Sequence, residues 1–148
     1  MTGTSSRSRG ARLATAAAAL EVFLAVGALA GGAALMLGPR GEILPLPVSA
    51  LVGSPFDTYL VPGLILFIVL GLGPLAAARL ARRRHPLGPL AACAVGVALL
   101  VWLAVEIAIV GFSMTPPLQP FYLLLGAVIT AVGIAWVRSR ARPSGIEV

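Results

Sequence analysis

Four long apolar segments account for most of this chain and restrict the environment in which it can fold. They cover residues 13–37, 59–78, 87–112 and 118–137, and each contains at most one Asp, Glu, Lys or Arg. About 20 helical residues cross a bilayer core about 30 Å thick. Each segment is apolar around its whole circumference, as helices in lipid are. We therefore predict an all-α fold, an integral membrane four-helix bundle that forms a single membrane domain over residues 1–148.

Composition excludes the alternative of a water-soluble domain. Of the 148 residues, 59% are hydrophobic and 11% are charged, whereas an ordinary soluble domain has about 25% charged residues. The formal net charge of +6 does not indicate nucleic-acid binding, because the arginines lie between apolar segments and not on a soluble surface interleaved with aromatic residues. We expect membrane lipids as partners, and no nucleic acid.

The arginines predict the orientation. All 11 basic residues are Arg, and ten of them flank the segments on one side: Arg7, Arg9 and Arg12 precede the first, Arg79, Arg82, Arg83 and Arg84 lie in the loop 79–86, and Arg138, Arg140 and Arg142 follow the fourth. Arg40 alone lies in the loop 38–58. The positive-inside rule then places both termini and the loop 79–86 in the cytoplasm of a multi-pass protein of the bacterial inner (plasma) membrane. These arginines serve either as general anchors or as a specific site for anionic lipid.

The first segment has an alternative interpretation. An arginine-containing start, an apolar stretch and the sequence Ala28-Leu29-Ala30 resemble a cleaved signal peptide. The apolar run continues through Leu37, however, and it contains Glu21 where a signal peptide would be uniformly apolar. We therefore expect this segment to remain as a membrane span.

The loop 38–58 is rich in proline and apolar residues, so we expect it to lie on the ends of the helices. Ser54, Pro55 and Asp57 match the N-cap, first-turn proline and early acid of a helix start. Pro62, followed by Gly63, predicts a kink near the beginning of the second span.

Small residues spaced four apart indicate where helices can approach closely in a membrane. Such pairs or stripes occur in three segments: Gly27 with Gly31, Ala92 with Gly96, and Ala127 with Ala131 and Ala135. The spacing leaves open whether these faces pack within one chain or between copies, so a homo-oligomer or another membrane protein is also a possible partner.

Two carboxyl groups fall inside the apolar segments, where an ionisable residue is a functional-site hypothesis by default. Glu21 lies about 12 Å from the cytoplasmic end of the first segment, and Glu106 about 9 Å from the outer end of the third. They occupy opposite halves of the bilayer and therefore do not form a paired acid and base site. Glu21 either reaches the cytoplasmic interface, pairs with an arginine or binds a ligand.

Glu106 has more polar residues near it in the sequence pattern than Glu21 has. Trp102 lies one turn before it on the same helix face, so this carboxyl either binds a proton or lipophilic cation or hydrogen-bonds a neighbouring helix. Four further polar residues belong to the same outer half and form a predicted outer polar cluster: Asp57, Tyr59, Gln119 and Tyr122.

The sequence offers little for catalysis or conduction. Cys93 is the single cysteine and His85 the single histidine, and His85 lies outside the apolar segments. We find no basis for a metal, a cofactor, a catalytic triad or a phosphate-binding loop. The second span is apolar from Leu60 to Ala78, so one chain does not line a hydrated path.

The stretch GGAALMLGPRGEILPLPVSALVGSPFDTYLVPGLILFIVLGLGPLAAA resembles a set of small bacterial four-span membrane proteins with no established activity. The shared features are Gly31-Gly32, the run from Ser54 to Gly63, the set Trp102, Glu106 and Gly111, and the run from Leu118 to Tyr122. The resemblance covers about residues 21–137 and implies the four-span architecture.

A second resemblance is to the small multidrug resistance transporters, through Leu20-Glu21-Val22. Their pattern has one essential Glu in the first helix, whereas this chain is longer and has a second buried Glu. The leading hypothesis is therefore a non-enzymatic accessory, assembly or lipid-associated subunit. The alternatives are an oligomeric transporter or channel for small or lipophilic cations and, third, a lipid-modifying enzyme.

Overall fold

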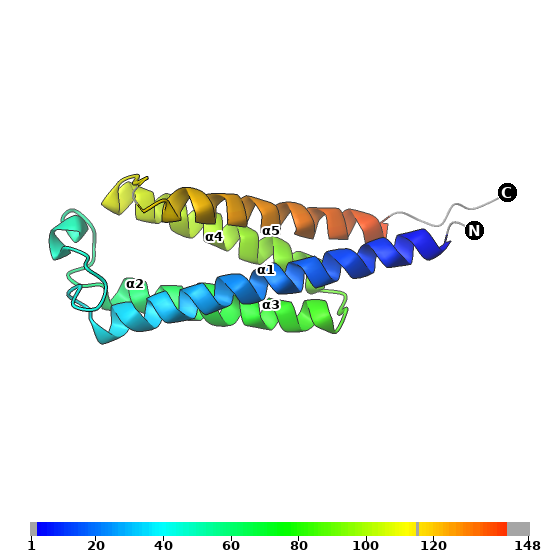
Figure 1. Cartoon of the computed structure of the whole chain (residues 1–148), viewed down its shortest axis with the longest axis horizontal. Coiled ribbons are helices and arrows are strands. Elements are labelled where there is room, and N and C mark those ends of the chain that lie inside the picture. Colours follow the sequence, from blue (N-terminus) through cyan, green and yellow to red (C-terminus); the bar gives the residue numbers. More distant parts are fainter. Residues whose placement is uncertain (1–2, 115, 142–148) are drawn as a thin grey trace.

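All regular elements in the described part of the chain, residues 3–114 and 116–141, are helical (Figure 1). The computed structural model contains the elements α1 (Gly3–Leu37), η1 (Val48–Leu51), α2 (Leu60–Ile65), η2 (Leu66–Leu72), α3 (Gly73–Arg82), α4 (Gly88–Val110) and α5 (Leu118–Ala141). Four stretches are long and apolar enough to cross a membrane: Ser8–Leu37, Leu60–Arg82, Gly88–Val110 and Leu118–Ala141. This confirms the all-helical fold class and the four candidate spans.

The helices extend beyond the predicted spans at the arginine-containing ends. Arg9 and Arg12 belong to α1, Arg79 and Arg82 to α3, and Arg138 to α5, because a helix that leaves the apolar core continues as long as its residues favour helix, and arginine does. At the other end, α4 stops at Val110, before Gly111 adopts a φ of +87°.

The second span contains an irregularity that differs from the predicted kink. Pro62 lies in the first turn of α2, where a missing N–H costs no helical hydrogen bond. The irregularity lies in η2, a π-helical stretch in which the widened turn includes a hydrogen bond from the Gly73 N–H to the Ile68 carbonyl. It ends two residues before Pro74, whose ring would crowd the carbonyl four residues earlier in a regular α-helix.

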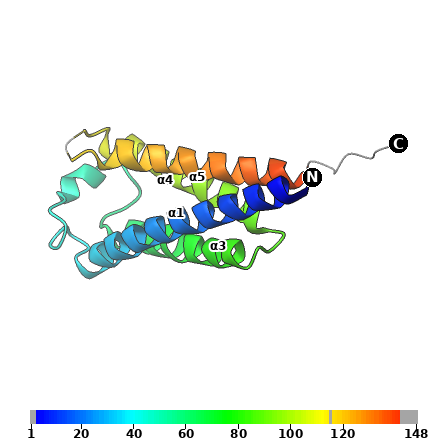
Figure 2. The same ribbon diagram turned by 45° about the vertical axis from the view of Figure 1, so that its right-hand side comes forward.

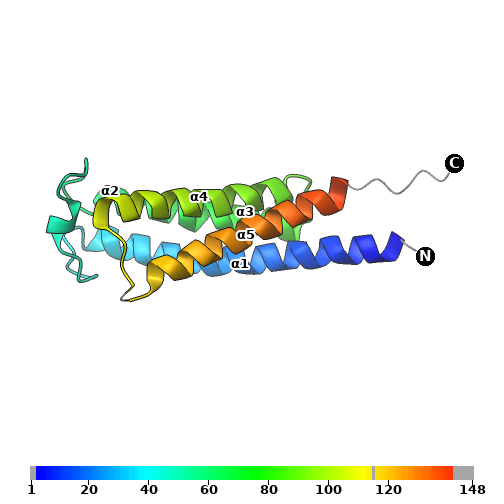
Figure 3. The ribbon, with the colours of Figure 1, turned by 90° about the horizontal axis from the view of Figure 1, so that it is seen from above.

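The four long helices lie side by side in two layers (Figures 1 and 2). The span α2–η2–α3 packs along α1, and α5 packs along α4 and crosses α1 (Figure 3). α1 begins and α5 ends at the same end of the molecule as the loop between α3 and α4, and we call this the arginine-rich end. The loop between α1 and α2 lies at the opposite end, the loop end.

Glycines set the closest approaches between helices. A Cβ on Gly32 of α1 would lie 2.8 Å from the carbonyl oxygen of Gly63, and a Cβ on Gly96 of α4 would lie 2.7 Å from the Thr130 nitrogen of α5 and 2.9 Å from the Gly126 carbonyl oxygen. The predicted contribution of Gly96 is therefore confirmed. In α1, Gly32 makes the closest backbone contact, whereas Gly31 meets only the Leu66 side chain at ordinary distance.

The alanine stripe predicted in the fourth span does not pack inside the molecule. Ala127 and Ala131 are exposed and Ala135 is half-buried. The face of α5 that meets α4 carries Gly126, Thr130 and Gly133 instead. Since α5 is rich in small residues on several faces, spacing alone does not identify the packed one.

The interior is aliphatic, and many large apolar side chains face outward. The main core cluster includes Leu24, Leu70, Leu99 and Ile129, and a second cluster of small residues, mainly alanines, surrounds Trp136. Outward-facing residues include Phe23, Val101 and Leu124, the last 66% exposed. So much exposed apolar surface is typical of helices that contact lipid.

The loop between α1 and α2 packs on the helix ends, as predicted. Leu51 and Tyr59 are buried with Leu35 of α1. The predicted helix start at Ser54, Pro55 and Asp57 is wrong, because the second span begins at Leu60. The Ser54 hydroxyl instead accepts a hydrogen bond from the Phe56 N–H at 3.2 Å, which closes a local turn.

Candidate functional site

The two carboxyl groups within the candidate spans differ in their surroundings. Glu21 lies on the buried face of α1 and is fully buried, whereas Glu106 is half-buried near the end of α4. They lie in different parts of the helix packing and share no hydrogen-bond partner. Among the described residues, the structure therefore gives the two carboxyl groups separate surroundings.

Glu106 is held by a compact polar network whose centre is Gln119. The Gln119 side-chain amide donates to Glu106 Oε1 at 3.2 Å and to the Gly111 carbonyl at 3.1 Å, and its oxygen accepts from the Ser113 N–H at 2.7 Å. Gln119 is 6% exposed, so these bonds connect the end of α4 to the start of α5 in a largely buried place. Of the two interpretations of Glu106, the hydrogen bond to a neighbouring helix is the one the structure shows. Trp102 packs against the main core cluster.

Glu21 has no such network. Both carboxylate oxygens are buried and have no hydrogen-bond partner in the described part of the chain. Residues one and two turns before Glu21 on the same face, Ala17 and Ala14, belong to the alanine cluster around Trp136, and Leu24 after it belongs to the main core cluster. The expectation that Glu21 reaches the cytoplasmic interface or pairs with an arginine is wrong for the described residues, because the helix points this short side chain into the interior.

The predicted outer polar cluster separates into different places. Gln119 belongs to the Glu106 network, whereas the Tyr59 hydroxyl donates to the Pro47 carbonyl in the loop at 3.0 Å, and burial raises the pKa of this phenol. Asp57 is exposed. Tyr122 lies beside Gly27 of α1, and its ring makes an edge-to-face contact with Phe121, with 5.2 Å between ring centroids.

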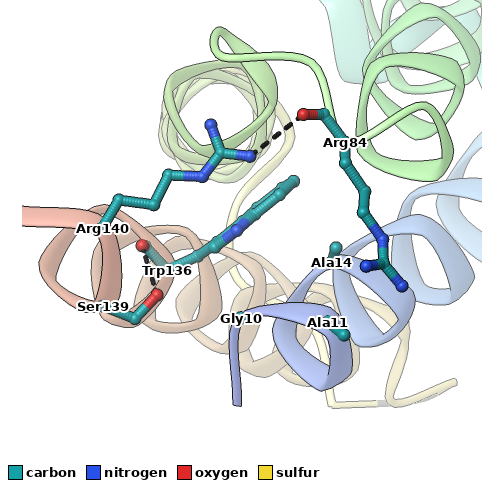
Figure 4. A pocket seen from close by; sticks show the side chains of 7 residues that line it. All are labelled: Gly10, Ala11, Ala14, Arg84, Trp136, Ser139 and Arg140. Atoms are coloured by element: carbon teal, nitrogen blue, oxygen red, sulfur yellow. Dashed lines mark hydrogen bonds between the residues drawn. The ribbon is translucent and has the colours of Figure 1, made fainter. Parts of the chain in front are cut away.

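A second polar feature, at the arginine-rich end, was not predicted. The Arg140 guanidinium donates hydrogen bonds to the carbonyls of Arg84, His85 and Pro86 at 3.2–3.3 Å, and it lies over the Trp136 ring at 5.0 Å from the centroid. These bonds fasten the loop between α3 and α4 to α5 (Figure 4). Trp136 and Arg140 are four residues apart and therefore adjacent on one helix face, and this spacing is the sequence signal for the contact.

Two open pockets lie beside the hydrogen bonds of Arg140 to this loop. The first, of about 390 Å³, is lined by Gly10, Ala11, Ala14, Arg84, Trp136, Ser139 and Arg140 (Figure 4). The second, of about 460 Å³, is lined by Ala14, Thr15, Ala18, Ala19, Val22, Ala81, Arg82 and Arg84. Ala14 and Arg84 line both, and among the described residues no acidic side chain lines either.

Among residues 3–114 and 116–141, no three His, Cys, Asp or Glu side chains lie close enough together to hold a metal ion. Arg142, counted with the cytoplasmic arginines above, lies outside the described residues. Comparison with protein families, with curated proteins and with solved structures finds no match for this chain.

Proposed function

We propose that this chain is a four-helix protein of the bacterial inner membrane that acts as a non-enzymatic, lipid-associated accessory subunit. One observation carries the proposal: open pockets at the arginine-rich end of four apolar helices are lined by Arg82, Arg84 and Arg140 and, among the described residues, by no acidic side chain. An arginine near an anionic membrane surface contributes about 1 kcal/mol to binding, so this end is suited to the lipid headgroup region.

The interior supports an accessory role over conduction by a single chain. A conducting path needs polar groups along its length. The described core clusters consist of aliphatic and aromatic side chains, and the Gln119 network lies at one end of the helices. Glu21 is enclosed and not connected to that network.

The test of this role is purification of the whole protein with its native lipids, followed by native mass spectrometry. Retained phospholipid or a retained partner protein is the expected result. A protein that is recovered without lipid or partner under conditions that preserve a control lipoprotein complex would contradict the proposal.

The proposed orientation needs its own test. α1 begins and α5 ends at the same end (Figure 1), and nine of the 11 arginines lie in described segments at that end, so both termini are proposed to be cytoplasmic. A green fluorescent protein fused to the C-terminus should fluoresce, and alkaline phosphatase at the same position should be inactive. An active phosphatase fusion would overturn the orientation.

The carboxyl of Glu21, which has no hydrogen-bond partner among the described residues, favours a second candidate, an oligomeric transporter for small or lipophilic cations. In that case a substrate or a second copy would supply the missing partner. Reconstituted protein should then support proton-coupled flux that Glu21→Gln abolishes and that Glu106→Gln leaves in place. Flux that survives both substitutions would defeat a carboxylate mechanism.

A further inference from the structure

We propose that Arg84 and the two pockets beside it form a specific site for one anionic glycerophospholipid. The inference rests on the proposed lipid-associated role and names the site and the headgroup class. The phosphate would lie at the Arg84 guanidinium, between the two pockets, and an acyl chain would follow the second pocket along α1.

The position of Arg84 is unusual for its residue type. Arg84 follows the end of α3 with a φ of +52°, while its N–H donates to the Ala81 carbonyl and the His85 N–H donates to the Leu80 carbonyl. This helix ending favours glycine, because a side chain in the left-handed region is strained. An arginine at a position that favours glycine indicates a role for its side chain, and Figure 4 shows that side chain directed toward Ala14 of α1.

The first pocket supplies a prepared cationic and polar wall. Arg140 is already fixed by three carbonyls and by the Trp136 ring, so little side-chain freedom is lost when an anion binds beside it. Its carbonyl contacts use Nη1 and Nη2, and a guanidinium has five N–H donors, so donor capacity remains for a phosphate oxygen. Ser139 lines the same wall.

The second pocket supplies the apolar part. Its wall on α1 runs from Ala14 to Val22, and eight residues of helix span about 12 Å. Ala18, Ala19 and Val22 form an apolar surface that leads away from Arg82 and Arg84 toward the middle of the span. A cationic head region that continues into an apolar groove matches a phospholipid and not a free anion. We therefore assign the site to a phospholipid.

The test compares Arg84→Gln with Arg83→Gln in the full-length protein. Arg83 is exposed, as Arg84 is, precedes it directly in the sequence and lines neither pocket, so its substitution removes the same charge without changing the pocket lining. Phosphatidylglycerol is titrated onto delipidated protein in neutral detergent, and binding is measured by native mass spectrometry. We expect wild type to bind one phosphatidylglycerol tightly. Arg84→Gln should weaken that first binding event by about tenfold or more, as expected for loss of a charge-assisted contact.

Two further arms separate the source of the phosphate and the effect of folding. Glycerol phosphate should not displace the lipid, because it lacks the acyl chain, and phosphatidylcholine should bind at least several times more weakly. Arg84→Gly should keep or raise thermal stability, since glycine suits the turn, and should still lose the tight lipid.

The outcomes are distinguishable. Equal weakening by Arg84→Gln and Arg83→Gln would overturn the site and leave the lipid-associated role intact. Displacement by glycerol phosphate would overturn the lipid assignment. Wild type that binds no phosphatidylglycerol above the level of phosphatidylcholine would overturn both the site and the proposed lipid-associated role.

Discussion

Replacing Glu21 by leucine should stabilise the packed helices. Glu21 is fully buried and both carboxylate oxygens lack a hydrogen-bond partner in the described part of the chain. A buried polar group without a partner costs about 1–3 kcal/mol, and its replacement by an apolar group of similar shape removes that cost. Leucine is similar in size and occurs throughout the surrounding core, so we expect the free energy of unfolding to rise by about 1–3 kcal/mol.

Two control variants test whether the change in unfolding free energy has the expected sign. Glu21→Gln keeps the size and replaces the carboxyl group by a polar amide, so it should change the unfolding free energy by less than about 1 kcal/mol. Glu106→Leu removes an acceptor of the Gln119 amide, and it should lower the unfolding free energy by about 1 kcal/mol. The same substitution type at the two acids should therefore act in opposite directions.

The assay is reversible unfolding in mixed micelles of detergent and sodium dodecyl sulfate, followed by circular dichroism, with each variant measured at equal protein and lipid content. A decrease of more than about 1 kcal/mol for Glu21→Leu would refute the reasoning. Such a decrease would show that the carboxyl has a stabilising partner in the assembled protein, which is the condition that a transport or ligand-binding role requires.

Three further predictions concern the packing and the two hydrogen-bonded sites. Gly96→Ala should lower the unfolding free energy by about 1–3 kcal/mol in the same assay, because a Cβ there meets the Thr130 backbone at 2.7 Å. Gly31→Ala should have little effect, because a Cβ there meets only the Leu66 side chain. Equal stability of the two variants would contradict the close α4–α5 contact. Gln119→Leu should lower the unfolding free energy by about 2 kcal/mol through the loss of three hydrogen bonds, and Glu106→Gln should keep normal assembly, so loss of folding on the latter change would count against a hydrogen-bonding role. Burial raises the pKa of Tyr59 above its ordinary value of 10.0. The neutral phenol therefore contributes its full stabilisation below pH 10.0, and this contribution is lost as the pH rises through the pKa of the folded protein. Tyr59→Phe should remove this alkaline loss of stability, and an unchanged dependence of stability on alkaline pH would refute the prediction.

The spans were predictable because their signal is local. Hydropathy over about 20 residues identifies a candidate membrane helix without knowledge of its neighbours, and the four predicted segments overlap the four observed stretches. The boundaries were less predictable. Pro62 and Pro74 lie in the same apolar run, and only the helix start at Leu60 makes Pro62 harmless and leaves Pro74 beside the irregular stretch.

The site was predictable only where the chain reversal is short. Glu106 and Gln119 are 13 residues apart across one loop, so both were placed in the outer half and the structure joins them. The hydrogen bonds of Arg140 connect residues that lie 54 to 56 positions apart in the sequence. Such contacts depend on which helix faces meet, and the many alanines and glycines of this chain permit several choices. Trp136 and Arg140 were therefore missed as a site.

The contrast between the two acids follows from where each lies along its helix. Glu106 lies near the end of α4, where the chain leaves the helix and the carbonyl of Gly111 and the side chain of Gln119 are free to form a network. Glu21 lies near the middle of α1, and at that level the neighbouring backbone groups are already used within helices. A carboxyl group in that position can gain a partner only if the helices separate or if another molecule enters between them. The unfolding free energy of Glu21→Leu therefore distinguishes a carboxyl group without a functional partner from a site that is completed by a ligand or a second chain.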